Sequence, residues 1–245
     1  MLILAIESSA KPVSVAVVES PGFIEIKTPV MPENTLLGQY FQNNGFSHSR
    51  TMLVMVESLL KNLDIRPADI DLIAVSRGPG SFTGVRIGVS AAKGLAWGLD
   101  IPVCGVSTLE AMAYQTPEPG FIICPVMDAR RSQVYNALLE WRDCSLIRLC
   151  EDRAISLEEL ATDLKSYKLP CLLVGDGVNV CLADKNPLFS NCNITPELQR
   201  YQTAYGVALA AINSKPVTAA ELEPVYLRPS QAERVRIGGV EETGV

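Results

Sequence analysis

The sequence has few histidines and few aromatic residues, and these shortages exclude several kinds of site. His48 is the only histidine among 245 residues, so a zinc or iron site built on several histidines cannot form within this chain. Phe, Trp and Tyr make up 6% of the residues, which is too few to predict a platform for stacking nucleic-acid bases. The seven cysteines form no C-x-x-C pair, and their apolar neighbours indicate reduced thiols in a cytoplasmic protein.

Long apolar runs and an excess of positive charge are also missing. No window reaches 18 apolar residues and the chain begins with a strand-like pattern, so we predict neither a signal peptide nor a membrane span. Lys and Arg number 21 against 27 Asp and Glu, a net charge of −6. Because nucleic-acid binding needs clustered Lys and Arg, this balance argues against direct binding. Direct binding by a local basic patch around Arg130 and Arg131 is the alternative.

Hydrophobic residues make up 48% of the chain, enough for a sizeable core. Strand-like runs cover residues 2–6, 13–18, 36–42, 71–75, 121–127, 132–140, 146–150 and 171–174. Helical patterns cover residues 47–63, 84–99, 107–114, 156–164 and 204–212, and Ser-x-x-Glu capping boxes open the third and fourth of these. With a linker at residues 117–120, this order predicts a two-lobed α/β protein. We expect lobes at residues 1–116 and 117–228, and a mobile tail at 229–245.

The helix predicted at residues 84–99 is unusually rich in glycine. It follows a Gly-Pro-Gly turn, with Ser81 or Thr83 as its N-cap, and its glycines are Gly84, Gly88, Gly94 and Gly98. Each interior glycine lowers helix stability by about 1 kcal/mol relative to alanine. A chain tolerates this cost where another segment or a partner must approach the helix backbone closely. The helix either packs tightly on its own sheet or has a second face that packs on a partner protein. The spacing matches neither the Walker pattern nor a nucleophile elbow.

The helix predicted at residues 47–63 is apolar on more than one side. One stripe contains Leu53, Val56, Leu60 and Leu63, and the other contains His48, Met52, Met55 and Leu59. Such a helix is either wholly buried or shared with a partner, and methionines suit an adaptable interface. We interpret His48 as a cap-region or interface residue.

The segment Gly-Pro-Gly-Ser-Phe-Thr-Gly-Val-Arg-Ile-Gly at residues 78–88, followed by residues 93–96 and 103–107, resembles the bacterial TsaB family, also called YeaZ. Shorter matching segments are residues 4–9, 48–50, 128–135 and 224–229, so the resemblance extends over the whole chain. It implies an α/β, two-lobed actin/Hsp70-like ATPase (ASKHA) fold with a reduced second lobe.

The resemblance also implies a function. As a TsaB-like protein, the chain would be a non-catalytic scaffold or dimerisation subunit that binds and supports TsaD, together with TsaE. The reaction of this complex would be threonylcarbamoyl transfer to N6 of adenosine 37 of tRNAs that read ANN codons. TsaE would use ATP, TsaD would use threonylcarbamoyl-AMP, and tRNA would meet this subunit only indirectly, through the complex. Its helices would form a bundle with TsaD, or a homodimer without TsaD. The predicted interface residues are His48, Met52, Met55, Leu59, Gly84, Val85, Gly88, Val89 and Ala92.

The sequence departs from TsaD at two motifs. The metal motif His-Met-Glu-Gly-His is replaced by residues 108–112, Thr-Leu-Glu-Ala-Met, and a capping box with Ser107 accounts for Glu110. The phosphate loop Ser-Gly-Gly-His-Thr is replaced by residues 128–131, Asp-Ala-Arg-Arg, whose bulk prevents close approach to phosphate. We therefore predict no catalytic residue, metal or bound cofactor. The alternative is a weak actin-like ATPase or a metallopeptidase-type enzyme.

Two turns are candidate nucleotide contacts in an actin-like fold. They are Glu7, Ser8 and Ser9 after the first strand, and Gly175, Asp176 and Gly177 after the strand at residues 171–174. Ordinary turns at the ends of strands explain both segments equally well, and we favour that interpretation.

Overall fold

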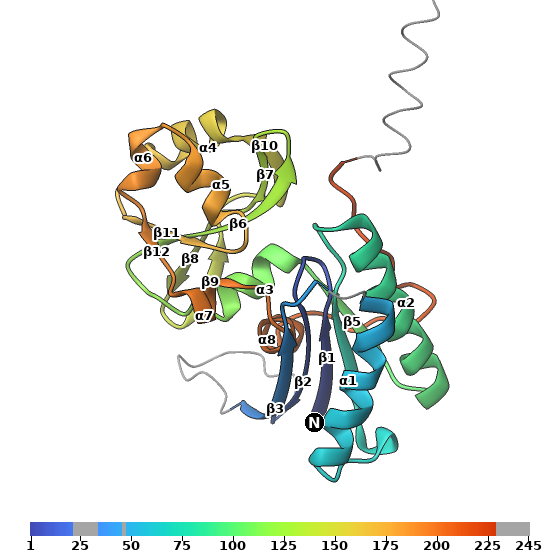
Figure 1. Cartoon of the computed structure of the whole chain (residues 1–245). Coiled ribbons are helices and arrows are strands. Elements are labelled where there is room, and N and C mark those ends of the chain that lie inside the picture. Colours follow the sequence, from blue (N-terminus) through green and yellow to red (C-terminus); the bar gives the residue numbers. More distant parts are fainter. Residues whose placement is uncertain (22–33, 46–47, 229–245) are drawn as a thin grey trace, which may run out of the picture.

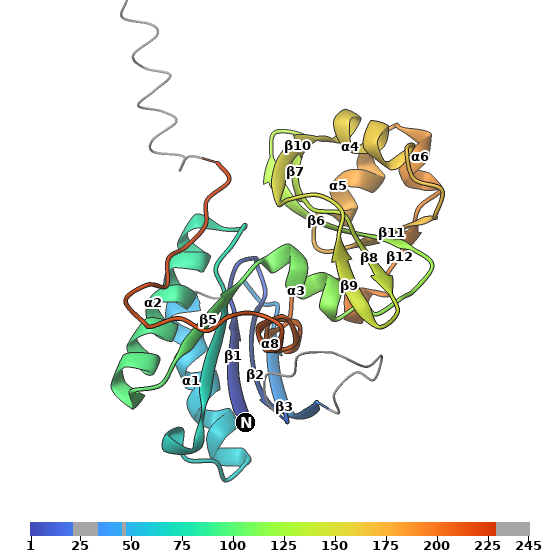
Figure 2. The ribbon, with the colours of Figure 1, turned by 180° about the vertical axis from the view of Figure 1, so that it is seen from behind.

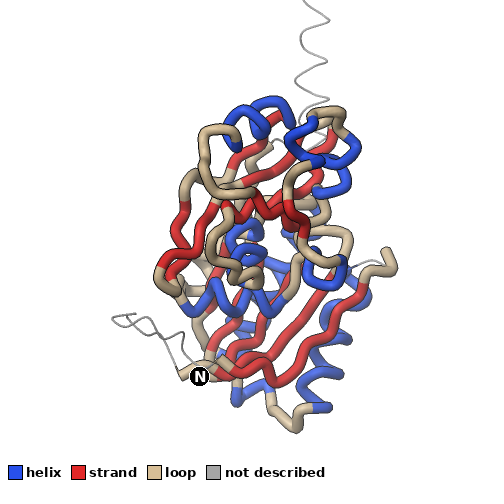
Figure 3. The backbone as a smooth tube through the Cα atoms, turned by 90° about the vertical axis from the view of Figure 1, so that its left-hand side faces the viewer, coloured by secondary structure: helices blue, strands red, loops and turns tan. Residues whose placement is uncertain are grey.

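The structure is a computed structural model that describes residues 1–21, 34–45 and 48–228. The tail predicted at residues 229–245 lies outside the described residues. Two lobes, each built on a sheet, are connected through helix α3 (Thr108–Tyr114) (Figure 1). In the view of Figure 3 the strands of the first lobe lie below those of the second, with helices between them. The expected two-lobed α/β class is confirmed.

The first lobe contains a five-stranded sheet in the order β3-β2-β1-β4-β5. Its strands are β1 (Leu2–Glu7), β2 (Val13–Glu19), β3 (Thr35–Gln42), β4 (Leu72–Ser76) and β5 (Val103–Val106). The first three are antiparallel, whereas β4 and β5 run parallel to β1. Helices α1 (His48–Asn62) and α2 (Phe82–Leu99) cover one face, and α8 (Ala204–Ile212) covers the other. A single 3-10 turn, η1 (Pro67–Asp69), follows α1.

Strand β1 has apolar side chains on both faces of the first-lobe sheet. Successive side chains point to opposite faces of a strand, so Leu4 and Ile6 pack with α1 and α2. Ile3 and Ala5 pack with α8 on the other side. The run therefore reads as continuously apolar, as is typical of a sheet buried on both faces.

The second lobe is organised around β6 (Ile122–Arg130). The other strands are β7 (Gln133–Asn136), β8 (Leu139–Arg142), β9 (Ser145–Arg148), β10 (Arg153–Ser156), β11 (Cys171–Val174) and β12 (Asn193–Ile194). The helices are α4 (Leu157–Leu164), α5 (Val178–Ala183), α6 (Pro187–Ser190) and α7 (Glu197–Arg200). The capping box predicted for α4 is present, with Ser156 and Glu159 bonded reciprocally.

Two predictions about this region were wrong. The single strand expected at residues 132–140 is two strands, because β6 pairs with β7 through its C-terminal half and with β8 through its N-terminal half. At the break, buried Asn136 donates to the carbonyl oxygens of Pro125 and Ala137, at 3.0 and 2.8 Å. The lobe boundary at 228 was also misplaced, because α8 and the segment after it belong to the first lobe.

Figure 2 shows this returning segment beside β5 and α2. Val217 forms a bridge with Val103 of β5, and Lys93 of α2 donates to the carbonyl oxygen of Leu222 at 2.9 Å. The lobes themselves meet at α3, where the indole nitrogen of Trp141 donates to Ala113 and Thr116. The second lobe is therefore an insertion between α3 and α8.

Candidate functional site

Helix α2 begins at Phe82, two residues before the predicted start at Gly84. Of the two candidate N-caps, Ser81 is the one used, and its hydroxyl accepts from Gly84 N at 3.3 Å. The helix ends at Leu99, as predicted, and its C-cap Asp100 adopts a left-handed conformation with φ 55°.

The first two glycines of α2 face the turn at the end of β1. A Cβ atom on Gly84 would lie 2.1 Å from Ser8 O, and one on Gly88 would lie 2.3 Å from Ser8 Oγ. Ser8 Oγ also donates to Gly84 O at 2.9 Å. Of the two interpretations, the structure supports tight packing within the chain for these two glycines.

The other predicted interface residues also lie mainly inside the lobe. Six side chains that we expected to contact a partner are at most 6% exposed and belong to the core between the helices and the sheet: Met52, Met55, Leu59, Val85, Val89 and Ala92. His48 is half-buried at the start of α1, with Nε2 3.2 Å from Pro12 O. This part of the interface prediction is therefore corrected, because these residues hold α1 and α2 on their own sheet.

The outer faces of α1 and α2 carry different apolar residues. Leu53 and Val54 of α1 are 48% and 58% exposed, and Trp97 of α2 is 83% exposed. Near Trp97, Gly94 and Gly98 have no atom within 4 Å of the Cβ position. These residues leave the surface of α2 open to a neighbour.

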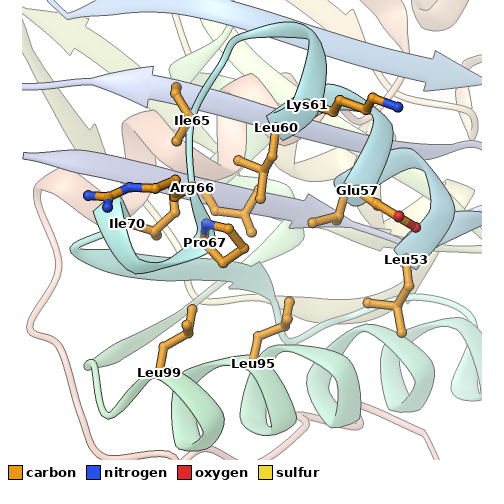
Figure 4. Close-up of a pocket in the computed structure, with 12 residues that line it drawn as sticks. Leu53, Glu57, Leu60, Lys61, Ile65, Arg66, Pro67, Ile70, Leu95 and Leu99 are labelled. Carbon is orange, nitrogen blue, oxygen red and sulfur yellow. The ribbon is translucent and has the colours of Figure 1, made fainter.

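A groove of about 570 Å³ lies between α1, α2 and η1 (Figure 4). Leu95 and Leu99 project into it from α2, and Leu60 lines it from α1. Glu57 and Lys61 add charged groups along α1. We call Leu53, Val54 and this groove the α1–α2 surface. Trp97 is two positions from both Leu95 and Leu99, so it projects from the opposite side of α2. Periodicity identified the Leu53 stripe, but the sequence analysis missed Trp97.

The turn after β1 is closed rather than open to a ligand. Glu7, Ser8 and Ser9 are wholly buried. Ser9 N donates to Glu7 Oε1, and Ser81 N donates to Ser9 O, both at 2.6 Å. Burial raises the pKa of the Glu7 carboxyl above its usual value, and the charge of Asp176 raises it further.

The turn after β11 faces this cluster from the second lobe. A Cβ on Gly175, which has φ 111°, would lie 2.1 Å from Val126 O, so the glycine allows β6 and β11 to close together. Gly177 N donates to the same oxygen at 3.0 Å. Gln202 donates to Asp176 at 2.7 Å, and burial raises the pKa of this carboxyl too.

The structure brings the two predicted turns close enough for the charge of Asp176 to act on Glu7. The Glu7 carboxyl is wholly buried and that of Asp176 is half-buried, and the backbone amides described above are already bonded to the protein. Anion sites depend on free amides and positive charge. The close contacts made by the glycines account for both turns.

Glu110 has a different role from the one predicted. Ser107 Oγ caps α3 by accepting from Glu110 N at 3.2 Å, but the Glu110 carboxylate does not close the capping box. It pairs instead with Arg148 at 2.5 Å, and Arg148 also pairs with Asp152 at 2.6 Å. This ion-pair network connects α3 to the second lobe.

Within residues 1–21, 34–45 and 48–228, no group of three or more His, Cys, Asp or Glu side chains is arranged to hold a metal ion. Across the same residues, none of the helices has both the length and the apolar character needed to cross a membrane.

Comparisons with known proteins agree on one family. The model of the family described as TsaD, tRNA N6-adenosine threonylcarbamoyltransferase, matches residues 44–219. The tRNA threonylcarbamoyladenosine biosynthesis protein TsaB of Bacillus subtilis is 37% identical over 71% of each chain. The TsaB protein of Haemophilus influenzae is 28% identical over 74% of this chain and 80% of its own.

A solved structure from Pseudomonas aeruginosa, described as an uncharacterized protein with similarity to peptidase YEAZ, has a TM-score of 0.73 and 24% identity. The match covers 93% of this chain and 99% of that one, so it shows a shared fold.

Proposed function

Because the chain belongs to the TsaB (YeaZ) family, we propose that it acts in threonylcarbamoyladenosine biosynthesis as a non-catalytic subunit that binds TsaD. The names of its relatives support a role in this tRNA modification. TsaE would complete the system, supplying ATP hydrolysis, while TsaD carries out the transfer to adenosine 37.

The observation that carries the binding role is the α1–α2 surface. Exposed leucine and valine side chains of α1 lie beside an apolar groove between α1 and α2. Clustered apolar exposure of this kind marks interaction sites. A helix of TsaD in this groove would remove Leu53 from water. In the absence of TsaD, a second copy of the chain would use the same surface.

The absence of catalysis is supported by residues in the core. Thr108 and Met112 stand where TsaD has histidines, and both are wholly buried. Glu110 is committed to Arg148. A hydrolytic or transfer centre at this position would need exposed ligands that this arrangement does not offer.

Sedimentation velocity of this chain with TsaD from the same organism tests the proposal. Leu53→Glu puts a charge into the interface and should weaken the heterodimer by about 2 kcal/mol, roughly 30-fold in Kd. Leu182→Glu is the matched control, because Leu182 is 43% exposed on α5 of the second lobe.

Loss of the heterodimer with Leu53→Glu, but not with Leu182→Glu, is the expected result. A heterodimer that survives Leu53→Glu would show that the surface lies elsewhere. No heterodimer with the unchanged chain would overturn the binding role itself. In a reconstituted tRNA modification assay, Leu53→Glu should lower the activity, and Leu182→Glu should leave it unchanged.

A further inference from the structure

The segment after α8 contacts two separate parts of the chain, one in each lobe. Val225 N donates to Arg77 O, in the loop after β4, at 2.7 Å. Three residues later, Arg228 donates to Ala129 O, at the end of β6, at 2.6 Å. The start of α2 and the β6–β7 hairpin therefore border a common surface that neither lobe forms alone.

The start of α2 contributes an ordered arginine between aromatic rings. The Arg86 guanidinium lies 3.9 Å from the centroid of the Phe82 ring and 5.6 Å from that of Tyr226. Arg86 Nε donates to the Tyr226 hydroxyl at 2.8 Å, and the two ring centroids are 4.6 Å apart. Arg86 and Tyr226 are exposed. This stack holds a cation and an aromatic face toward solvent without closing them off.

The β6–β7 hairpin contributes two more cations. Arg130, Arg131 and Ser132 have φ values of 67°, 57° and 55°, a left-handed run that is disfavoured for residues other than glycine. Arg131 is exposed, and the side chain of Arg130 is 84% exposed. The tight tip thus holds two adjacent arginines at the surface.

These groups form a basic patch on an acidic protein. We call it the arginine rim, and its members are Arg86, Arg130, Arg131 and Arg228. Among the described residues, the only carboxylate in ion-pair range of any of them is Asp128, 3.7 Å from Arg130. Tyr226 and Arg228 are two positions apart, so their Cα atoms are within about 7 Å. A few nucleotides would span that distance.

Guanidinium groups bind phosphate, and exposed aromatic faces stack the unpaired bases of single-stranded RNA loops. We propose that the arginine rim binds a single-stranded segment of the tRNA directly, with Tyr226 as a stacking face. This rests on the proposed function, and it revises the expectation from net charge that tRNA meets this subunit only indirectly. The relevant quantity is the local arrangement of four arginines, not the charge of −6 over the whole chain.

Binding of an unmodified tRNA transcript should be measured by fluorescence anisotropy at several salt concentrations, with the chain alone and with TsaD. The double variant Arg86→Gln, Arg131→Gln should raise Kd by about tenfold and reduce the salt slope by about 1 to 2, as expected for two lost phosphate contacts. Tyr226→Ala should raise Kd by about tenfold through lost stacking.

The charge-matched control is Lys165→Gln, Lys168→Gln. Both lysines are exposed between α4 and the start of β11. Because β11 runs parallel to β6, they lie at the opposite end of those strands from Arg131. This control should leave both Kd and the salt slope unchanged.

Equal effects of the two double variants, or no salt-dependent binding with or without TsaD, would overturn the inference. Loss of TsaD or TsaE association in the arginine variant, with tRNA binding intact, would identify the rim as a protein contact and also overturn it. Sedimentation with TsaD separates this outcome from failure of the proposed function, since Leu53 and the rim are tested independently.

Discussion

The two halves of α2 use the same residue type for opposite purposes. In the N-terminal half, Gly84 and Gly88 allow Ser8 to approach the helix backbone, so these glycines serve the chain's own core. In the C-terminal half, a Cβ on Gly94 or Gly98 would meet no neighbouring atom within 4 Å, and both glycines lie near exposed Trp97. A glycine in a helix can therefore mark either a close contact with another segment or an open surface. The structure is needed to distinguish the two cases.

Breaking the packed half should have the largest effect. Gly84→Ala places a Cβ 2.1 Å from Ser8 O, a backbone atom that cannot rotate away. Overpacking of this kind should lower the free energy of unfolding by about 3 kcal/mol. Chemical denaturation with urea measures the change. A Gly84→Ala protein as stable as the parent would show that the turn after β1 can move away from α2.

The buried turn offers a second, pH-dependent contrast. Because burial raises the pKa of Glu7 in the folded state, folding favours the protonated carboxyl. The stabilisation from the protonated Glu7 carboxyl is fully present below the unfolded pKa near 4.5. This stabilisation is lost as pH rises from that value toward the folded pKa. Glu7→Gln resembles the protonated form, so unfolding free energy should fall less in this window than for the parent. Identical pH profiles from urea unfolding would contradict this.

Substitutions in the C-terminal half of α2 should give the smallest change in unfolding free energy, and this change should be a gain. Gly94→Ala and Gly98→Ala meet no atoms within 4 Å, so each should raise unfolding free energy by about 0.5 to 1 kcal/mol through helix propensity. Thermal unfolding measures this gain. If TsaD approaches this backbone closely, the same variants should weaken the heterodimer. Destabilisation of the free chain would show that the α2 surface is already occupied within the monomer.

Much of the local structure follows from the sequence. The N-cap at Ser81, the end of α2 at Leu99 and the capping box at Ser156 rest on contacts within a few residues. The fold class followed from the resemblance, whose longest segment spans the turn and first half of α2.

The failures concern contacts between distant segments. In α1 two apolar stripes coexist, and periodicity alone cannot tell how much of each is covered. Met52 and Met55 of one stripe and Val56 of the other are buried, whereas Leu53 and Val54 are exposed. Asn136 divides an apparently continuous strand only because β6 offers two separate partners. The position of α8 likewise depends on a sheet formed by residues more than 90 positions earlier.

That last placement has a consequence for biosynthesis. The sheet face that contains Ile3, Ala5, Leu72 and Ala74 is covered by α8, the last helix among the described residues. A ribosome that has added residue 116 has synthesised every strand of this sheet but not the helix that covers it. At about 5 to 20 residues per second, roughly 5 to 20 seconds pass before Ile212 is added. During this interval the nascent chain exposes an apolar sheet face, a natural binding site for a chaperone, and a fragment ending at 116 should aggregate.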